Sequence, residues 1–252
     1  MKRLIGIIQF MTRIPIPIDT GFDEEFHKSI LYFPIVGLVL GICYILVAKL
    51  GLIIFDPYIT AVLVLASEVI LTGGLHLDGL GDSFDGLYSY RDKDKILEIM
   101  KDSRLGTNAL LAIVIVFLLK VGFLSSLLEQ GMLWPIMTMP VAARSMQVIA
   151  CYKTRTPREK GLGNLFIGKV STSYLIGVIC LLLVIHGATL YSLAEPKLYG
   201  KELIILLILV IGVRGFVRSV YKKIDGITGD ILGCICELAE LGYLVLTYLI
   251  RG

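Results

Sequence analysis

The sequence predicts an all-α polytopic membrane protein, with about seven transmembrane helices and an N-terminal helix that is interfacial or re-entrant. Of its 252 residues, 56% are hydrophobic and 18% are charged, and the mean hydropathy is +0.82. An ordinary soluble domain carries about 25% charged residues, so this composition excludes a soluble globular enzyme and a disordered chain. The net charge of +3 is too small to indicate a polyanionic partner, and we expect no nucleic-acid binding.

Seven apolar stretches approach the length of about 20 helical residues that a bilayer core about 30 Å thick requires. Because lipid offers the backbone no hydrogen-bond partners, we expect each stretch to be a helix. The stretches are residues 31–55, 59–77, 108–128, 132–151, 173–190, 203–221 and 231–250. The first thirty residues contain only a short apolar run, which Pro15 and Pro17 end, so we expect a short helix at the membrane surface or re-entering it. Residues 1–252 should form a single integral-membrane domain.

The lysines and arginines are distributed unequally between the two sides of the predicted bundle. If the N-terminus is cytosolic, sixteen of them fall on the cytosolic side, and only Lys197, Lys201 and Arg251 fall on the other. The positive-inside rule therefore predicts that the N-terminus faces the cytosol. We expect the protein to lie in the cell (inner) membrane, so the lipid bilayer is one of its partners. Two large cytosolic loops, residues 76–107 and 152–172, are expected to form the active site.

The first of these loops carries three aspartates at helical spacing. Asp78, Asp82 and Asp85 stand at i, i+4 and i+7, so on a helix they fall within about 60° of one another. Carboxylates this close repel each other unless a cation lies between them, and Mg²⁺ or Mn²⁺ prefers oxygen ligands from carboxylates and phosphates. The spacing therefore predicts a divalent metal site. The simpler alternative is a solvated helix start with acidic residues in its first turns.

Two further carboxylates could belong to the same site. Glu68 lies inside the preceding apolar stretch, where a carboxylate is costly and usually functional. It could be a metal ligand, orient His76, or make a contact between helices. Asp230 stands where the N-cap of the last helix is expected, so both capping and metal binding are open for it.

Cations inside or beside the predicted spans also need an explanation. Lys101 and Arg104 precede the third span, where they either anchor the helix at the cytosolic surface or clamp a phosphate group. Arg144 is two turns inside its helix, and we expect it to face the site. Two other intramembrane cations, Lys120 and Arg214, could pair with a buried acid such as Glu237 or Glu240.

The second large loop contains a glycine-rich run, Lys160-Gly-Leu-Gly-Asn-Leu-Phe-Ile-Gly-Lys169. It lacks the preceding strand of a dinucleotide-binding motif and the Lys-Ser/Thr ending of a phosphate-binding P-loop. The run therefore predicts only a flexible loop that can cover a substrate.

Five motifs stand out along the chain: Phe10-Met-Thr-Arg-Ile-Pro-Ile-Pro17, Gly73-Gly-Leu-His-Leu-Asp-Gly-Leu-Gly-Asp82, Met100-Lys-Asp-Ser-Arg-Leu-Gly-Thr107, Gly161-Leu-Gly-Asn-Leu-Phe-Ile-Gly-Lys169, and Thr228-Gly-Asp-Ile-Leu-Gly233 with Glu237. Together they resemble the motifs of the cobalamin synthase family, whose members are also called adenosylcobinamide-GDP ribazoletransferases. They occur in the family's order over nearly the whole chain. Asp225 departs from the family pattern, because family members more often have a glycine-like residue at this position.

The resemblance implies a membrane-bound, Mg²⁺-dependent transferase. Such an enzyme joins adenosylcobinamide-GDP to α-ribazole or its 5′-phosphate, forms adenosylcobalamin or its 5′-phosphate, and releases GMP. A ribose hydroxyl must then attack a phosphorus of a pyrophosphate, a reaction that depends on alignment and on neutralising charge. A homo-oligomer is left open.

The same resemblance, combined with the residue chemistry, gives the expected site. Asp78, Asp82 and Asp85 would hold Mg²⁺, with Glu68 or Asp230 as additional ligands. His76 or a carboxylate such as Asp82 would accept the proton of the attacking hydroxyl. The expected substrate-binding residues are Lys101, Asp102, Arg104, Arg144, Gly163, Asn164 and Lys169.

Two other functions compete with this interpretation. A CDP-alcohol phosphotransferase also places aspartates at helical spacing beside the membrane, but its Asp-Gly is followed by Ala-Arg and then by two aspartates at spacings of four, which this chain does not match. An ion-coupled transporter would use the intramembrane charges as a translocation path. Transporters usually show paired halves and broken helices at the midplane, whereas the polar residues here gather at one face.

Overall fold

The computed structural model describes residues 1–21, 23–193 and 196–251, and this part of the chain is helical without a β-strand. The α-helices are α1 (Lys2–Met11), α2 (Phe33–Ile54), α3 (Pro57–Thr72), α4 (Leu75–Leu87), α5 (Lys93–Ile99), α6 (Thr107–Glu129), α7 (Trp134–Cys151), α8 (Thr172–Leu193), α9 (Tyr199–Ile224) and α10 (Gly229–Arg251). Short 3₁₀ helices cover Phe26–Tyr32, Leu162–Leu165 and Pro196–Leu198. The predicted all-α class is confirmed, and the short N-terminal helix expected before Pro15 is α1.

Five segments of the described chain are long and apolar enough to cross a membrane, so the protein is a multi-pass membrane protein. They are Phe26–Ile54, Thr107–Glu129, Thr172–Leu193, Tyr199–Ile224 and Gly229–Ile250. The stretch predicted at 59–77 is not one straight helix, because Gly73 and Gly74 both take left-handed backbone angles and α3 meets α4 at a bend of 91°. A sixth span results only if this bent pair counts as one. The expected count of about seven is therefore not confirmed.

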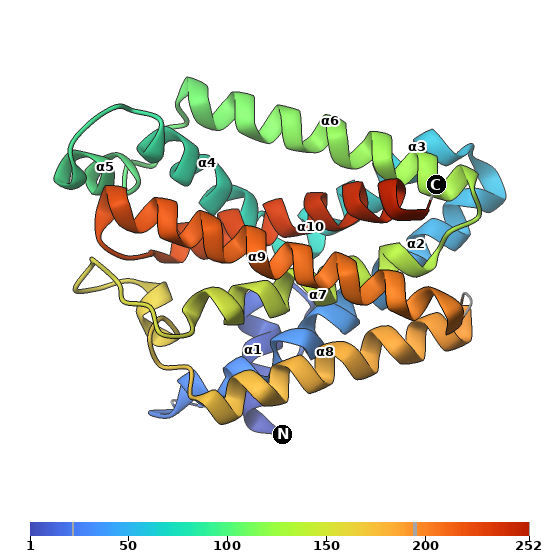
Figure 1. Ribbon diagram of the computed structural model, residues 1–252, viewed down its shortest axis with the longest axis horizontal. Coiled ribbons are helices and arrows are strands. Elements are labelled where there is room, and N and C mark those ends of the chain that lie inside the picture. Colours follow the sequence, from blue (N-terminus) through green and yellow to red (C-terminus); the bar gives the residue numbers. More distant parts are fainter. Residues whose placement is uncertain (22, 194–195, 252) are drawn as a thin grey trace.

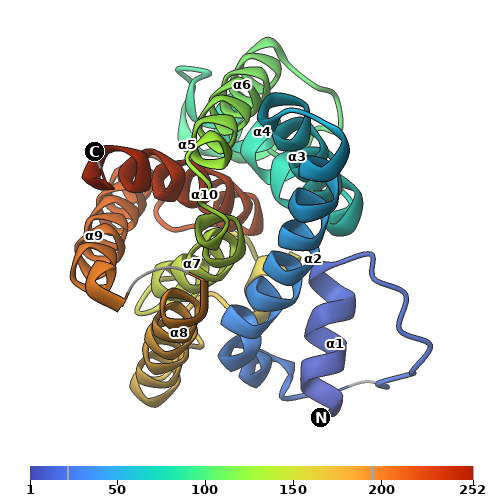
Figure 2. The ribbon, with the colours of Figure 1, turned by 90° about the vertical axis from the view of Figure 1, so that its right-hand side faces the viewer.

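Helix α7, which was also predicted as a span, forms the centre of the bundle instead of facing lipid. Every residue in it except Met137 is buried, and it packs against α2, α8, α9 and α10 (Figure 2). The close approach of α2 depends on two glycines, since a Cβ on Gly37 or Gly41 would lie 2.4 or 2.1 Å from a backbone oxygen of α7. This central position explains how α7 can carry Arg144 and Gln147, because protein rather than lipid surrounds them.

Helix α4 packs along α10 and α6, so the beginning of the predicted loop 76–107 is a buried helix. Glycines allow α4 and α10 to touch backbone to backbone. A Cβ on Gly79 would lie 2.7 Å from the carbonyl oxygen of Asp230, and one on Gly233 would lie 3.2 Å from the Cα of Gly79. This contact places the start of α10 beside the start of α4.

The polar connections gather at one end of the bundle, on the left in Figure 1. They are the segment around α5, the loop between α7 and α8, and the turn between α9 and α10. Lys93 on α5 pairs with Asp225 in the turn at 2.9 Å, and Lys223 donates to the carbonyl oxygen of Leu87 at 2.6 Å. The candidate site lies toward this end.

Candidate active site

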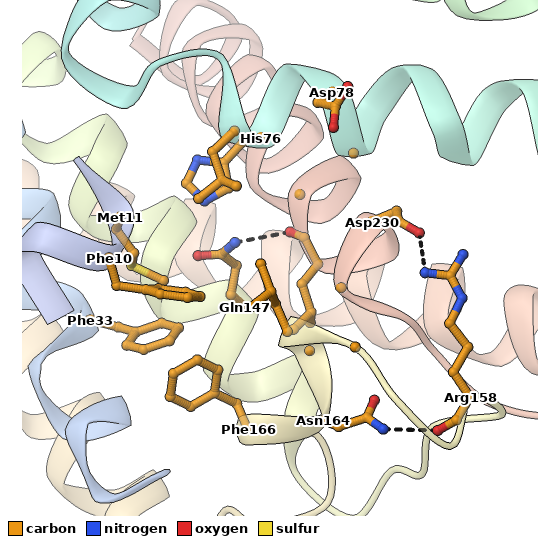
Figure 3. Close-up of a pocket in the computed structure, with 18 residues that line it drawn as sticks. Phe10, Met11, Phe33, His76, Asp78, Gln147, Arg158, Asn164, Phe166 and Asp230 are labelled. Atoms are coloured by element: carbon orange, nitrogen blue, oxygen red, sulfur yellow. Dashed lines mark hydrogen bonds and ion pairs between the residues drawn. The ribbon is translucent and has the colours of Figure 1, made fainter. Parts of the chain in front are cut away.

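A cavity of about 200 Å³ lies where α1, α2, α4, α7, α10 and the loop between α7 and α8 meet (Figure 3). Its wall is built from four of the five sequence motifs. The first motif contributes Phe10 and Met11, the second His76 and Asp78, the fourth Gly163 and Asn164, and the last Asp230. Motifs that are more than two hundred residues apart in the sequence thus converge on one cavity, which makes it the candidate site.

The cavity has two ends of different chemistry. Figure 3 shows Phe10, Met11, Phe33 and Phe166 together on one side, and Asp78, Asp230 and Arg158 on the other. His76 and Gln147 lie between the two groups.

The aspartates of α4 form the acidic end together with the start of α10. Asp78 is exposed toward the cavity, and Asp82, one turn further along α4, is half-buried. The carboxylate of Asp82 interacts electrostatically with those of Asp78, Asp230 and Asp85, and Arg158 is the cation that acts on it. The helical spacing thus places Asp78 and Asp82 as expected, and α10 adds Asp230.

Asp230 does not have the capping role that the sequence left open. Helix α10 begins at Gly229, so Asp230 is in its first turn, where the helix dipole favours a negative charge. The hydroxyl of Thr228 accepts a hydrogen bond from the backbone N–H of Ile231 at 3.3 Å and so provides the cap. The Asp230 carboxylate is left to pair with Arg158 at 2.8 Å.

Asp85 has a separate contact. Its two carboxylate oxygens accept hydrogen bonds from the backbone N–H groups of Gly106 at 2.7 Å and Ala109 at 2.9 Å, which are at the start of α6. A Cβ on Gly106 would lie 2.5 Å from these oxygens, so this contact requires the glycine of the third motif. Asp85 therefore holds α6 against α4.

Arg158 is a cavity residue that the sequence analysis missed, because it was counted only as one of many cytosolic cations. Its Nη1 pairs with Asp230, while its Nε is buried and has no partner among the described residues. Asn164 fixes this loop, because its side-chain amide donates to the carbonyl oxygens of Arg158 at 2.9 Å and Glu159 at 3.0 Å. No spacing rule in the sequence indicated that Arg158 would reach the aspartates.

The expected phosphate clamp before α6 does not line the cavity. Lys101, Arg104 and Lys169 are exposed outside it. Arg104 forms hydrogen bonds with Asp102 and thereby lowers the pKa of that carboxyl to about 2. None of the four predicted substrate-binding residues Lys101, Asp102, Arg104 and Lys169 thus lines the cavity.

A buried charge network lies deeper in the bundle. The ammonium of Lys120 is 2.7 Å from carboxylate oxygens of Glu68 and Glu237, and it also pairs with Glu240. Glu240 in turn pairs with Arg144. The predicted pairing of Lys120 with Glu237 and Glu240 is confirmed, and Glu68 makes a contact between α3 and α6 instead of lining the cavity.

This network reaches the cavity through His76. Nη2 of Arg144 is 3.4 Å from Nδ1 of His76, and both side chains are buried. A guanidinium can only donate hydrogen bonds, so Nδ1 accepts, and a neutral His76 carries its proton on Nε2. Arg144 therefore orients His76 as a hydrogen-bond donor.

Comparisons with known proteins agree over the whole chain. The profile of the cobalamin-5-phosphate synthase family matches residues 3–248. A relative from Clostridioides difficile (strain 630) is 51% identical, over 99% of this chain and 98% of its own. A relative from Alkaliphilus metalliredigens (strain QYMF) is 48% identical, over 100% of this chain and 97% of its own. Both are named adenosylcobinamide-GDP ribazoletransferase, and no solved structure matches.

Proposed function

The chain belongs to the cobalamin-5-phosphate synthase family, and we propose that its reaction takes place in the cavity where four of its motifs meet. The enzyme joins adenosylcobinamide-GDP to ribazole. In this transfer a ribose hydroxyl oxygen of the acceptor forms a bond to the phosphorus that carries adenosylcobinamide. The bond from that phosphorus to GMP breaks, and GMP leaves. The convergence of the motifs on one cavity is the observation that supports this placement.

The acidic end fits a Mg²⁺ ion held by one or two of the carboxylates of Asp78, Asp82 and Asp230 together with a substrate phosphate. Together these carboxylates carry more negative charge than the single positive charge of Arg158 can balance, so a bound cation would relieve their repulsion. Within the described chain, only Glu68, Glu237 and Glu240 bring three ligand oxygens within 4.8 Å of one another, and the Lys120 ammonium already pairs with all three. The aspartates are spread more widely, which suits Mg²⁺, because this ion usually combines one or two carboxylates with substrate phosphates and water. Bound there, it would neutralise charge on the pyrophosphate.

Arg158 is the residue that we assign to a substrate phosphate. Its unpaired, buried Nε–H is costly unless an acceptor reaches it, and a phosphate oxygen is a strong acceptor for a guanidinium. The donor is much larger than the cavity, so its corrinoid part must stay outside. Lys101, Arg104 and Lys169 are exposed at this end of the bundle and are available to the outer part of the donor.

His76 and the aspartates divide the proton chemistry. Because Arg144 leaves the proton of His76 on Nε2, we assign His76 to donating a hydrogen bond to the substrate. The proton of the attacking hydroxyl then passes to a carboxylate of the acidic end. Asp78 lines the cavity, and Asp82 is one turn away on the same helix face.

We place the cavity end of the bundle at the cytosolic face of the cell membrane. The two large loops at this end carry ten of the 24 lysines and arginines, whereas Lys197 and Lys201 lie at the other end. The positive-inside distribution supports this orientation. Adenosylcobinamide-GDP would then enter from the cytosol.

The assignment can be tested with Asp82→Asn in proteoliposomes that contain Mg²⁺. We expect GMP release to fall by more than about a hundredfold, since the variant removes a charge of the acidic end while keeping its shape. Asp94→Asn, on the exposed surface of α5, is the matched control and should keep full turnover. Near-normal GMP release by a folded Asp82→Asn protein would contradict the assignment.

A further inference from the structure

We propose that the apolar end of the cavity binds the base of the ribazole acceptor and determines which bases the enzyme accepts. This inference rests on the proposed function and adds a specificity site to it. The site consists of Phe10, Met11, Phe33 and Phe166, with Gln147 at its inner edge (Figure 3).

The aromatic residues form a rigid wall. The rings of Phe33 and Phe166 are edge to face with centroids 5.2 Å apart, and those of Phe10 and Phe166 are 6.0 Å apart. Met11, Phe33 and Phe166 are each less than 5% exposed. They come from α1, α2 and the loop after α7, so three separate segments fix the shape of this end. Edge-to-face rings of this kind present an apolar surface that suits a flat aromatic ligand.

The size of the cavity favours the acceptor over the donor. A protein cavity of about 150 Å³ is large enough to bind benzene. The whole cavity, its acidic end included, measures about 200 Å³, so it has room for a bicyclic ring such as the dimethylbenzimidazole of ribazole but cannot enclose a corrinoid.

Polarity distinguishes the ribazole base from guanine, the other base in the reaction. Dimethylbenzimidazole linked to ribose has no N–H donor, whereas guanine has several donors and a carbonyl acceptor. Buried polar groups without partners are costly, so guanine is a poor ligand for a wall of phenylalanines. Dimethylbenzimidazole has a single ring-nitrogen acceptor to leave without a partner, so it loses less there than guanine.

Gln147 supplies the polar contact at the inner edge. Its Nε2 donates to the carbonyl oxygen of Leu232 at 3.0 Å, which fixes the amide. Its Oε1 is buried and has no partner in the described chain, although the residue lines the cavity and is only 3% exposed. An unpaired buried acceptor at this place fits a hydroxyl of the acceptor's ribose.

The order of groups along the cavity matches the order of groups in the acceptor. Phenylalanines come first, Gln147 and His76 lie in the middle, and Asp78 and Asp230 lie at the far end (Figure 3). A base bound among the phenylalanines places its ribose at Gln147 and directs the sugar toward the aspartates. The apolar end thus aligns the attacking hydroxyl as well as selecting the base.

The test compares Phe10→Leu and Phe166→Leu with the wild type in detergent-purified enzyme. For each protein, kcat and KM are measured with α-ribazole and with α-ribosyladenine, whose base carries an amino donor. We expect each variant to raise the KM for α-ribazole about tenfold and to change the KM for α-ribosyladenine less. Phe123→Leu removes a similar ring contact, to Tyr248 at 5.5 Å outside the cavity, and should change neither constant.

A second variant and a second ligand complete the design. Gln147→Met should raise the KM for both ribosides, because both carry the ribose, and inhibition by GMP should stay unchanged in all variants. Thermal unfolding checks that each variant is folded. An unchanged KM for α-ribazole in both phenylalanine variants would overturn the inference, as would a parallel loss of GMP inhibition, which would assign this end to guanine. A wild type that transfers nothing to α-ribazole or to its 5′-phosphate would instead refute the proposed function.

Discussion

Replacing Lys120 with methionine should destabilise the bundle more than any other single change of an intramembrane cation. Lys120 is fully buried and pairs with Glu68 on α3 and with Glu237 and Glu240 on α10. The variant removes the ammonium and leaves the three carboxylates with Arg144 as the nearest cation. Arg144 then compensates only Glu240, so the carboxyl groups of Glu68 and Glu237 are left buried at a low dielectric without their ammonium partner.

The size of this effect follows from other buried ion pairs. Removing one partner of a buried pair costs about 3–5 kcal/mol, because an uncompensated charge is left behind. For a chain of this size, each kcal/mol lowers the melting temperature by about 2–4 °C, so Lys120→Met should lower it by about 6–20 °C. This loss is a large part of the 5–15 kcal/mol that is typical of folded proteins.

The assay is thermal unfolding of the purified protein in detergent, followed by loss of helical signal. Lys49→Met, on the exposed face of α2, is the matched control and should change the melting temperature by less than about 2 °C. The double variant with Glu237→Gln should recover part of the loss, since it removes one of the unpaired charges. A Lys120→Met protein that melts within about 2 °C of the wild type would refute the reasoning.

Further predictions concern the cavity and the helix contact behind it. Arg158→Gln should raise the KM for adenosylcobinamide-GDP about 10–150-fold, which corresponds to about 1.5–3 kcal/mol for a hydrogen bond to a charged group. Lys160→Gln, an exposed substitution in the same loop, should leave this KM unchanged. Equal changes of KM in the two variants would count against the phosphate contact. Gly79→Ala should cost about 1–3 kcal/mol and most of the turnover, because the added Cβ would lie 2.7 Å from the Asp230 carbonyl and push α4 away from α10. Gly122→Ala meets no atom within 4 Å and should stabilise α6 by up to about 1 kcal/mol; similar melting temperatures for the two alanine variants would contradict the contact.

Features with a local or periodic basis were predictable from the sequence. The spacing of Asp78 and Asp82 placed them on one helix face, which α4 confirms. The cost of a charge in lipid required a partner for Lys120, and the glutamates of α10 are that partner. In each case a single helix or a single energetic rule was sufficient.

Features that depend on how distant segments meet were not predictable. Arg158 reaches Asp230 only because the loop after α7 folds over the start of α10, where Gly163 lies against Gly229. Phe10 and Phe33 looked like ordinary apolar residues until α1 and α2 placed them against Phe166. The bend at Gly73 and Gly74 likewise turned one expected span into two helices, although hydropathy there is continuous.

The location of the metal is the central claim, and electron paramagnetic resonance of Mn²⁺ bound to the enzyme with adenosylcobinamide-GDP tests it most directly. The acidic end of the cavity and the buried glutamates are the two acidic groups that compete for the ion. We predict that the bound Mn²⁺ signal is lost in Asp82→Asn and Asp230→Asn and retained in Glu68→Gln. A signal that survives both aspartate substitutions but disappears in Glu68→Gln would place the metal in the buried network and contradict the account.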